Sequence, residues 1–345
     1  MRRACLQLTW ALPLLTAVAL SAGCKRAQPE AGKPLLFPAL ATHQDELETL
    51  QLRAAGNAVL VTLFRKGGLW RVAERGDWPA DAGRVSQYLF VLSQSRLSEE
   101  KTANPGLFPR LGVEPVSRPD ATGTELMLSA PGASWQLVIG KEHPKFDSNY
   151  VRVNGRPQAW LTDLPVSFDR SPASWLDHRL LDLPLARIVE VRVDGKLGRP
   201  FRLIHRDDRF RLDDVPSAAM HDSHQGDALA SALDQLQFED LAADTEPEAA
   251  ERELQFVAVD GLRFTVQAWH ASDRLWVRVA ASIDQARAAE WARQGTGTAA
   301  NPVNLSRQVS GWNERFQGRK FLLPAAVSAT LMLSYEEILH GAPGS

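Results

Sequence analysis

The stretch Leu63-Phe-Arg-Lys-Gly-Gly-Leu-Trp-Arg-Val72 aligns without a gap on Leu203-Ile-His-Arg-Asp-Asp-Arg-Phe-Arg-Leu212. Each stretch places two apolar residues before a central pair that suits a turn, and an aromatic residue after it. Paired glycines accept positive φ without strain, and aspartates bond to nearby backbone groups in turns. Both stretches are therefore predicted to be β-hairpins.

Outward from the two hairpins the sequence keeps the same order. Alternating apolar residues precede each hairpin, and a proline followed by a helical pattern comes after it, at Pro79 and Pro216. The apolar faces of the two predicted helices are Val85, Tyr88, Leu89 and Leu92, and then Leu229, Leu233 and Leu236. Spacings of three and four residues are typical of a helix that buries one face. The recurrence about 140 residues apart predicts an internal duplication rather than two unrelated hairpin-helix units.

The whole chain is predicted to have an α+β fold, with repeated antiparallel β-meander plus helix units in two to three packed subdomains. The predicted units are residues 38–120, a β-rich middle segment 121–186 that ends in a helix over 172–183, a second unit 187–243 and a C-terminal β/helix unit 254–345. The C-terminal unit shows three strand patterns, a helix around 283–293, and a last helix that contains Val327, Leu331, Met332 and Leu339.

The N-terminus has the layout of a secretory signal. Arg2 and Arg3 precede an apolar run, and the run ends at Leu20-Ser-Ala-Gly-Cys24, which resembles a bacterial lipobox. Residues 1–23 are therefore predicted to be a lipoprotein signal peptide, cleaved after Gly23, with Cys24 lipidated and residues 24–37 as a tether. The alternative is an uncleaved membrane helix, but the apolar run is barely long enough to span a bilayer.

Composition limits the compartment and the partners. The 345 residues are 44% hydrophobic and 23% charged, with a formal net charge of −2, which is ordinary for a globular body. Because there is no basic excess to attract phosphates, no nucleic-acid partner is expected. The only cysteines are Cys5 and Cys24, so a cleaved and lipidated chain has no free thiol, as suits an oxidising envelope compartment. The expected location is the bacterial cell envelope, lipid-anchored and facing the periplasm.

Several short motifs contain residue types found in functional sites, but none predicts a catalytic, cofactor or metal site. The glycine-rich run 295–300 lacks the strand before it and the helix after it that a dinucleotide loop needs. His221 and His224 lack further ligands at metal-site spacing. Asp177-His178 lies near Ser174, but no Gly-x-Ser-x-Gly turn exists to expose an activated serine.

Tryptophans are the remaining candidates, because indoles form both protein cores and carbohydrate-stacking platforms. Nine follow the predicted signal: Trp70, Trp78, Trp135, Trp160, Trp175, Trp269, Trp276, Trp291 and Trp312. Most occupy positions that face the core in the predicted strands and helices, so core packing is favoured over a binding cleft.

Four stretches together resemble a known family. They are Lys101-Thr-Ala-Asn-Pro-Gly-Leu-Phe-Pro-Arg-Leu-Gly-Val-Glu114, Tyr150-Val-Arg-Val153 with Gln158-Ala-Trp-Leu161, Trp175-Leu-Asp-His-Arg-Leu-Leu-Asp-Leu-Pro184, and Gly311-Trp312 with Phe321-Leu-Leu-Pro324. This pattern is similar to the domain-of-unknown-function family DUF4340. The resemblance implies the extracytoplasmic part of proteins encoded beside gliding-motility-type ABC transporter components, with no established enzyme activity and no catalytic residues to carry over.

The expected function is therefore a membrane-anchored, non-catalytic accessory lipoprotein of an ABC-type transport system, with an envelope protein as partner. The alternative is an envelope hydrolase or a carbohydrate-binding lipoprotein that uses a cleft lined by tryptophans.

Overall fold

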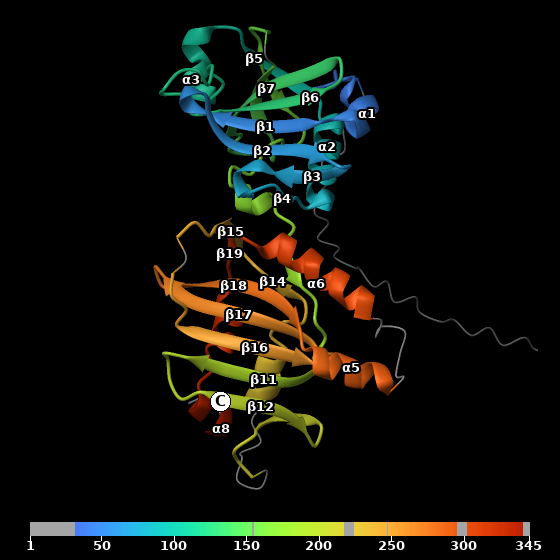
Figure 1. The fold of residues 1–345 in the computed structure, drawn as a ribbon. Coiled ribbons are helices and arrows are strands. Elements are labelled where there is room, and N and C mark those ends of the chain that lie inside the picture. Colours follow the sequence, from blue (N-terminus) through green and yellow to red (C-terminus); the bar gives the residue numbers. More distant parts are fainter. Residues whose placement is uncertain (1–31, 154, 217–223, 247, 295–301, 341–345) are drawn as a thin grey trace, which may run out of the picture.

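The protein forms two lobes, each built on one large antiparallel sheet (Figure 1). The computed structural model describes residues 32–153, 155–216, 224–246, 248–294 and 302–340. The predicted cleavage site at Gly23 and lipidation site at Cys24 lie outside these residues. Within the described part of the chain, no helix has the length and apolar composition needed to cross a membrane. The sequence-based expectation of a mixed fold with antiparallel sheets is confirmed.

The N-terminal lobe holds a nine-stranded sheet in the order β4-β3-β2-β1-β6-β7-β8-β9-β5. Its strands are β1 Thr49–Ala54, β2 Ala58–Lys66, β3 Leu69–Val72, β4 Trp78–Pro79, β5 Leu97–Thr102, β6 Thr124–Ala130, β7 Ala133–Glu142, β8 Asn149–Val153 and β9 Ala159–Thr162. Its helices are α1 Leu40–His43, α2 Ala82–Gln94 and α3 Phe108–Leu111.

The C-terminal lobe holds an eight-stranded sheet in the order β13-β12-β11-β16-β17-β18-β19-β15. Its strands are β11 Ile188–Gly195, β12 Phe201–Arg206, β13 Arg209–Leu212, β15 Asp240–Ala243, β16 Arg252–Ala258, β17 Leu262–Ala271, β18 Arg274–Ile283 and β19 Arg319–Leu322. Its helices are α4 Gln225–Ala230, α5 Gln285–Arg293, α6 Pro302–Phe316, α7 Ala325–Leu331 and α8 Tyr335–His340. Two short strands, β10 Arg179–Leu181 and β14 Leu236–Gln237, pair with each other and belong to neither large sheet.

Apart from β4, the two sheets place their strands in the same order along the chain. In both, the first strand of the sheet along the chain, β1 or β11, lies in the interior of the sheet, and the strand that follows the helix closes the far edge, as β5 and as β15. The two predicted hairpins also pair alike: Leu63 faces Val72, and Leu203 faces Leu212. Both turns use two residues with positive φ, namely the glycine pair in one lobe and the aspartate pair in the other.

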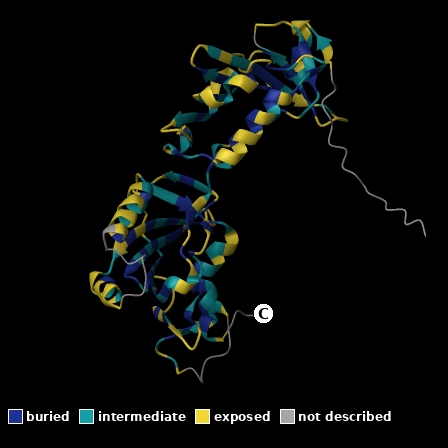
Figure 2. Cartoon of the chain, turned by 90° about the vertical axis from the view of Figure 1, so that its right-hand side faces the viewer, coloured by how far each residue is buried: buried dark blue, intermediate teal, exposed yellow. Residues whose placement is uncertain are grey.

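Each sheet buries one face against helices. In the N-terminal lobe the predicted helix is present as α2, and its residues Val85, Leu89 and Leu92 are buried. The helix begins where the Asp81 carboxylate accepts a hydrogen bond from the Arg84 amide, an N-cap that satisfies a free backbone donor. Figure 2 shows buried residues gathered between the sheets and helices and exposed residues on the outer side of α2.

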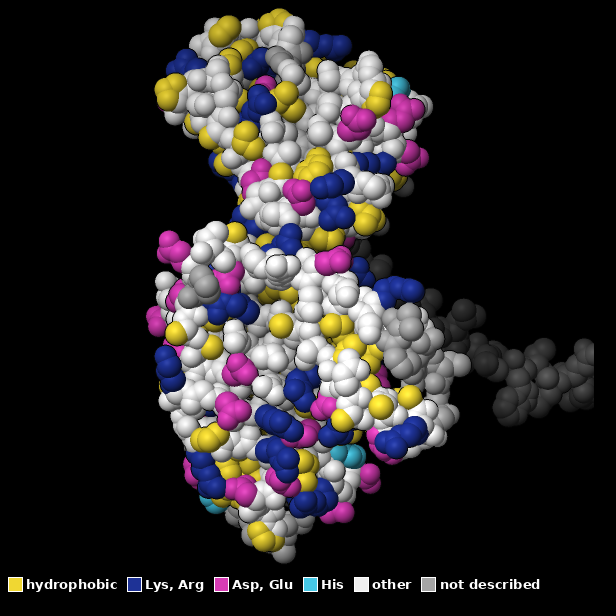
Figure 3. All heavy atoms as spheres, in the orientation of Figure 1, with side chains coloured by type: hydrophobic (Ala, Val, Ile, Leu, Met, Phe, Trp, Pro, Cys, Tyr) yellow, Lys and Arg dark blue, Asp and Glu magenta, His cyan; other side chains and the backbone are white. Residues whose placement is uncertain are grey.

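The lobes meet around the side chain of Trp78, which is 1% exposed. Its indole nitrogen donates to the carbonyl oxygen of Asp177 at 2.9 Å. The rings of Phe238 and Phe321 each have their centroid 5.4 Å from the indole, and the guanidinium of Arg315 lies 4.3 Å from it. Edge-to-face aromatic contacts and a cation over an indole both add to the stability gained from burial. The junction is therefore a packed interface, seen in Figure 3 as a narrower waist between the lobes.

Hydrogen bonds complete this junction. Arg75 donates through Nε and Nη2 to the two carboxylate oxygens of Asp240 at 2.6 and 3.0 Å. Arg319 donates to the carbonyl oxygen of Gly76 at 2.8 Å. Because these bonds join residues of the N-terminal lobe to residues of the C-terminal sheet, they fix the orientation of one lobe on the other.

Three predicted helices differ from the structure. The helix predicted over 172–183 is wrong: Pro172–Trp175 forms one 3₁₀ turn, and the chain continues as β10. Backbone pairing with distant segments replaces helical bonds there, because the Phe238 amide donates to the His178 carbonyl oxygen. The second repeat's helix ends at Ala230, so Leu236 lies in β14. The single C-terminal helix is instead two short helices, α7 and α8.

Each large sheet draws its strands from two of the predicted units. Residues 38–120 and 121–186 contribute strands to one sheet, because β6 pairs with β1. Residues 187–243 and 254–345 likewise share the other, because β16 pairs with β11. Cross-strand pairing of segments far apart in sequence therefore joins units that local patterns separate.

Candidate functional site

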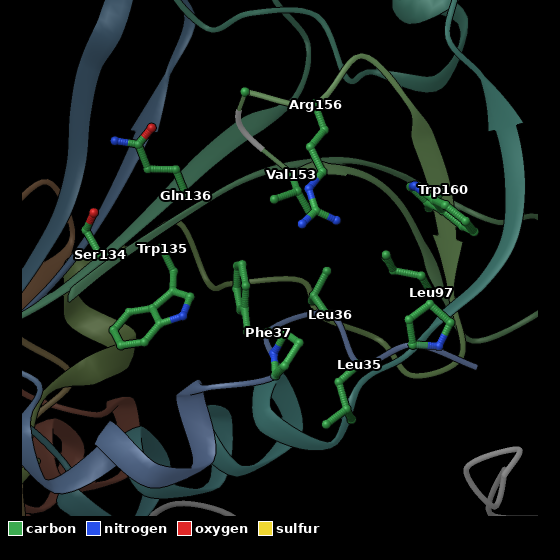
Figure 4. A pocket seen from close by; sticks show the side chains of 13 residues that line it. Leu35, Leu36, Phe37, Leu97, Ser134, Trp135, Gln136, Val153, Arg156 and Trp160 are labelled. Carbon is green, nitrogen blue, oxygen red and sulfur yellow. The ribbon is translucent and has the colours of Figure 1, made fainter. Parts of the chain in front are cut away.

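The candidate site is an open groove of about 580 Å³ in the N-terminal lobe, here called the tryptophan groove. It lies between the N-terminal segment 34–38 and the ends of β7, β8 and β9 (Figure 4). Its lining consists of Pro34, Leu35, Leu36, Phe37, Pro38, Leu97, Ser134, Trp135, Gln136, Val153, Gly155, Arg156 and Trp160.

The strands place the groove at the rim of the core face of the sheet. Trp135 faces the buried Leu128 across β6 and β7, and Trp160 faces the buried Val151 across β8 and β9. Successive side chains of a strand point to opposite faces, so these residues share the face that carries the core. Both indoles are half-buried.

The opposite wall is the N-terminal segment, held by backbone bonds to the start of β5. The Leu36 amide donates to the Ser95 carbonyl oxygen at 2.8 Å, and the Leu97 amide donates to the Pro34 carbonyl oxygen at 2.9 Å. These bonds bury Leu36 and Phe37, which form the floor seen in Figure 4. The groove is thus preformed by regular pairing on both walls.

The chemistry of the groove is apolar with one cation. Two indoles, one of them in edge contact with the His43 ring at 5.7 Å, provide flat apolar surface. Arg156 is exposed, and its guanidinium projects into the groove in Figure 4. No carboxylate among the described residues pairs with Arg156, and the described lining includes no Asp or Glu. Such a surface can hold an aromatic or aliphatic group and pair with an anion beside it.

A second cavity, of about 590 Å³, lies at the lobe junction beside Asp177, Arg179 and Arg315. Its charges already serve the fold. The Asp177 carboxylate pairs with the Arg179 guanidinium at 2.9 Å, and that hydrogen bond lowers the pKa of Asp177 below its usual value. Arg315 donates to the Arg179 carbonyl oxygen at 2.7 Å. This cavity is therefore less suited to a ligand than the tryptophan groove.

The structure separates the residues that sequence motifs had suggested for catalysis. His178 faces the carbonyl oxygen of Phe238 at 2.7 Å, and Asp177 pairs with Arg179, so neither activates Ser174. His224 contacts Arg209, while His221 and the glycine-rich run 295–300 lie outside the described residues. Within the described chain, no group of three or more His, Cys, Asp or Glu side chains is placed to hold a metal.

Six of the nine tryptophans fall into two kinds, and Trp276, Trp291 and Trp312 are half-buried elsewhere. Trp70, Trp78, Trp175 and Trp269 are buried, as predicted for core residues. Trp135 and Trp160 instead line the groove, which sequence reasoning missed. Nothing in the local pattern distinguishes them, because a strand residue at the rim of a core has the same alternation as one at its centre.

A comparison with protein-family models shows to which family the chain belongs. The family model described as a domain of unknown function, DUF4340, matches residues 70–255, which is more than half of the chain. The protein belongs to the DUF4340 family. No curated protein and no solved structure matches the chain.

The first DUF4340 stretch, 101–114, forms a cap on the outer face of the N-terminal sheet. Phe108 and Val113 are buried there against Val138, and the Arg152 guanidinium lies 5.1 Å from the Phe108 ring. A Cβ on Gly140 would lie 2.2 Å from a carbonyl oxygen of the cap, so only glycine permits this close approach. The stretch is therefore explained by packing.

The other DUF4340 stretches gather at the sheet edge and at the lobe junction. The second forms β8 and β9, which carry Trp160 into the groove. The third crosses between the lobes and supplies the carbonyl oxygen that accepts from Trp78. The fourth stretch lies beyond the matched residues 70–255; it supplies Trp312 of α6 and Phe321 of β19, which packs on Trp78. The resemblance thus marks the groove wall and the junction.

Proposed function

We propose that this DUF4340 protein is an extracytoplasmic lipoprotein of the bacterial envelope, anchored through Cys24, and a non-catalytic component of an ABC-type transport system. The tryptophan groove holds a protein partner in that system. One observation carries the proposal: an apolar groove opens beside the residues at which the predicted tether joins the body, and its Arg156 pairs with no carboxylate of the described residues.

Chain length supports this arrangement. Pro34 lies ten residues after Cys24 in the sequence, and a chain of that length reaches at most ~35 Å when extended. A lipid on Cys24 would keep the groove within this distance of the membrane surface. Tethering also raises the effective concentration of the body near a membrane partner, so a modest affinity is sufficient for binding.

The transport partner rests on the family resemblance, which implies a place beside gliding-motility-type ABC transporter components. The packed lobe junction suits an accessory role, because a rigid body can hold two partners in a fixed relation. We also infer that the two lobes descend from duplication of one β-meander plus helix unit; their common strand order and hairpin register support this origin.

A second candidate is carbohydrate binding, favoured by the two half-buried indoles of the groove. Sugars stack on such rings, and Arg156 could bind an acidic sugar. The hydrolase form of this alternative is weaker. Glycoside hydrolysis uses a pair of carboxylates that flank the substrate, and the described groove lining offers none.

Metabolic labelling with a fatty-acid analogue tests the anchor. Wild-type protein and Cys5→Ser, the matched control for the other cysteine, should carry the label in the membrane fraction. Cys24→Ser should lack it. Label that persists in Cys24→Ser, or a wild-type protein without label, would contradict the anchor.

Affinity capture of the membrane-extracted protein tests the partner. Subunits of an ABC transporter should be enriched with the wild-type protein and lost with a Trp135→Ala, Trp160→Ala double variant. A wild-type capture without transporter subunits would overturn the transport role, and retention of a soluble polysaccharide by the groove would favour the second candidate.

A further inference from the structure

The pairing registers of the two sheets correspond position by position, starting from the equivalent hairpin residues Leu63 and Leu203. The successive cross-strand partners are Leu63, Leu50, Leu128 and Trp135 in the N-terminal sheet, and Leu203, Val191, Phe256 and Phe264 in the C-terminal sheet. Trp135 therefore occupies the position in its lobe that Phe264 occupies in the other.

The next strands continue the correspondence. In the first sheet, Leu137 lies two residues after Trp135 and pairs with Val153, while Val151 pairs with Trp160. In the second sheet, Val266 lies two residues after Phe264 and pairs with Val279, while Val277 pairs with Phe321. Trp160 therefore corresponds to Phe321. Gly155 lies two residues after Val153, and Ala281 lies two residues after Val279, so these two residues also correspond. The groove in the N-terminal lobe therefore corresponds to the surface over Phe264, Ala281 and Phe321 in the C-terminal lobe.

In the C-terminal lobe this surface is covered by α6. The ring of Trp312 lies edge-on to Phe264 at 5.0 Å, and the ring of Phe316, four residues later, lies edge-on to Phe321 at 5.9 Å. Between them, the Asn313 side chain accepts from the Ala281 amide at 2.8 Å and donates to its carbonyl oxygen at 2.9 Å. One helix thus covers both aromatic positions and the strand end between them.

Among the described residues, the N-terminal lobe has no counterpart of α6. Residues 284–318 connect β18 to β19 and include α5 and α6, whereas residues 154–158 alone connect β8 to β9. That short connection supplies Gly155 and Arg156 to the groove wall. The segment 34–38 covers part of the same face, and the tryptophan groove is the part that stays open.

We propose that the tryptophan groove binds an amphipathic helix of a partner protein, with two aromatic side chains four residues apart, in the way that α6 covers its own lobe. This names the class of partner for the binding role proposed above and rests on that role. The first aromatic residue packs on Trp135 and the second on Trp160. The residue that follows the first aromatic meets the turn at Gly155 and Arg156, where a carboxylate replaces Asn313 and pairs with the guanidinium.

The geometry agrees with helix-in-groove recognition, in which aromatic anchors at helical spacing fill an apolar groove. The apolar stripe of α6 is Leu305, Val309, Trp312 and Phe316, and its other side is exposed. A partner helix of the same pattern would bury the two half-buried indoles. The burial of aromatic anchors in a preformed groove is where binding energy usually concentrates.

A labelled synthetic peptide with the sequence of α6, Pro302–Phe316, tests the proposal on detergent-extracted full-length protein by fluorescence anisotropy. The peptide carries Asn313→Glu to engage Arg156. We expect saturable binding that weakens by at least about tenfold in Trp135→Ala and Trp160→Ala protein. Trp276→Ala, a half-buried indole on the outer face of the C-terminal sheet, is the matched control and should leave the affinity unchanged.

Variants of the peptide keep the test decisive even if the protein variants misfold. Replacing Trp312 or Phe316 by Ala within the peptide should weaken binding to wild-type protein by a similar factor. A photoreactive group at the Phe316 position of the peptide should crosslink to residues 153–160. Absence of saturable binding up to about 1 mM, equal affinity for all peptides, or crosslinks confined to the C-terminal lobe would overturn the proposal. The binding measurement needs no membrane, so its failure is distinct from failure of the lipid anchor.

Discussion

Replacement of Trp78 by Ala should strongly destabilise the protein and uncouple its lobes. The indole is buried between lobes, in contact with Phe238, Phe321 and Arg315, and its nitrogen satisfies the Asp177 carbonyl oxygen. Truncation of a buried Trp to Ala typically costs about 3–5 kcal/mol. An unsatisfied buried carbonyl adds to this cost, although water entering the new cavity can offset part of it. We expect a loss of about 4 kcal/mol in the free energy of unfolding.

Urea unfolding followed by circular dichroism and by tryptophan fluorescence measures this loss. Wild-type protein should unfold in one transition seen by both probes, because the junction couples the lobes. Trp78→Ala should unfold at lower urea, with two separable transitions. Trp78→Phe keeps one aromatic ring but loses the N–H donor and part of the indole volume, so it should cost about 2 kcal/mol, less than Trp78→Ala.

Phe90→Ala is the matched control, because that ring lies on α2 and is 60% exposed. It should change the stability by less than about 0.5 kcal/mol. If Trp78→Ala lowers the free energy of unfolding by less than about 1 kcal/mol and keeps a single transition, the junction is not a packed interface that couples the lobes.

Three further predictions concern the cap, the junction and the C-terminus. Gly140→Ala should cost about 2 kcal/mol in thermal or urea unfolding, because the new Cβ meets a cap carbonyl oxygen at 2.2 Å. A double-mutant cycle on Arg75 and Asp240 should give a coupling energy of about 1 kcal/mol, since the pair is bidentate and half-buried. Hydrogen bonds from the amide and hydroxyl of Ser334 lower the pKa of Glu337. Its stabilising contribution is therefore present above the unfolded-state pKa and lost as the pH falls through the folded-state pKa, and Glu337→Gln should reduce this acid dependence of unfolding.

For each of these predictions, a control variant or a contradicting result can be named. Gly311→Ala meets no atom within 4 Å and lies inside α6, so it should stabilise rather than destabilise. A coupling energy indistinguishable from zero would show that the Arg75–Asp240 pair does not hold the lobes together. An unchanged acid dependence in Glu337→Gln would show that this carboxylate is not the group that titrates.

Strand alternation predicted the central strands of both sheets, because each buries one face and exposes the other. The edge strands β4, β5 and β15 were missed, whereas the edge strand β13 was predicted as part of the second hairpin. β5 has the sequence Leu-Ser-Glu-Glu-Lys-Thr, and charges on an edge discourage pairing with other chains but erase the alternation. The helix α6 was missed as well, although its apolar residues Leu305, Val309, Trp312 and Phe316 stand at helical spacing and could have revealed it.

The groove could not be predicted from local patterns. Trp135 and Trp160 come together only through pairing across β7, β8 and β9, and their half-exposure depends on the short connection between β8 and β9.

The most direct test of a partner-binding groove is photocrosslinking in living cells from a single position at its rim. A photoreactive amino acid at Ser134, exposed beside the groove, should crosslink to one membrane-associated protein, and the crosslink should depend on Cys24 and on Trp160. The same amino acid at Ser86, exposed on the far side of α2, should not give this product. Equal products from both positions, or none from Ser134, would contradict the account.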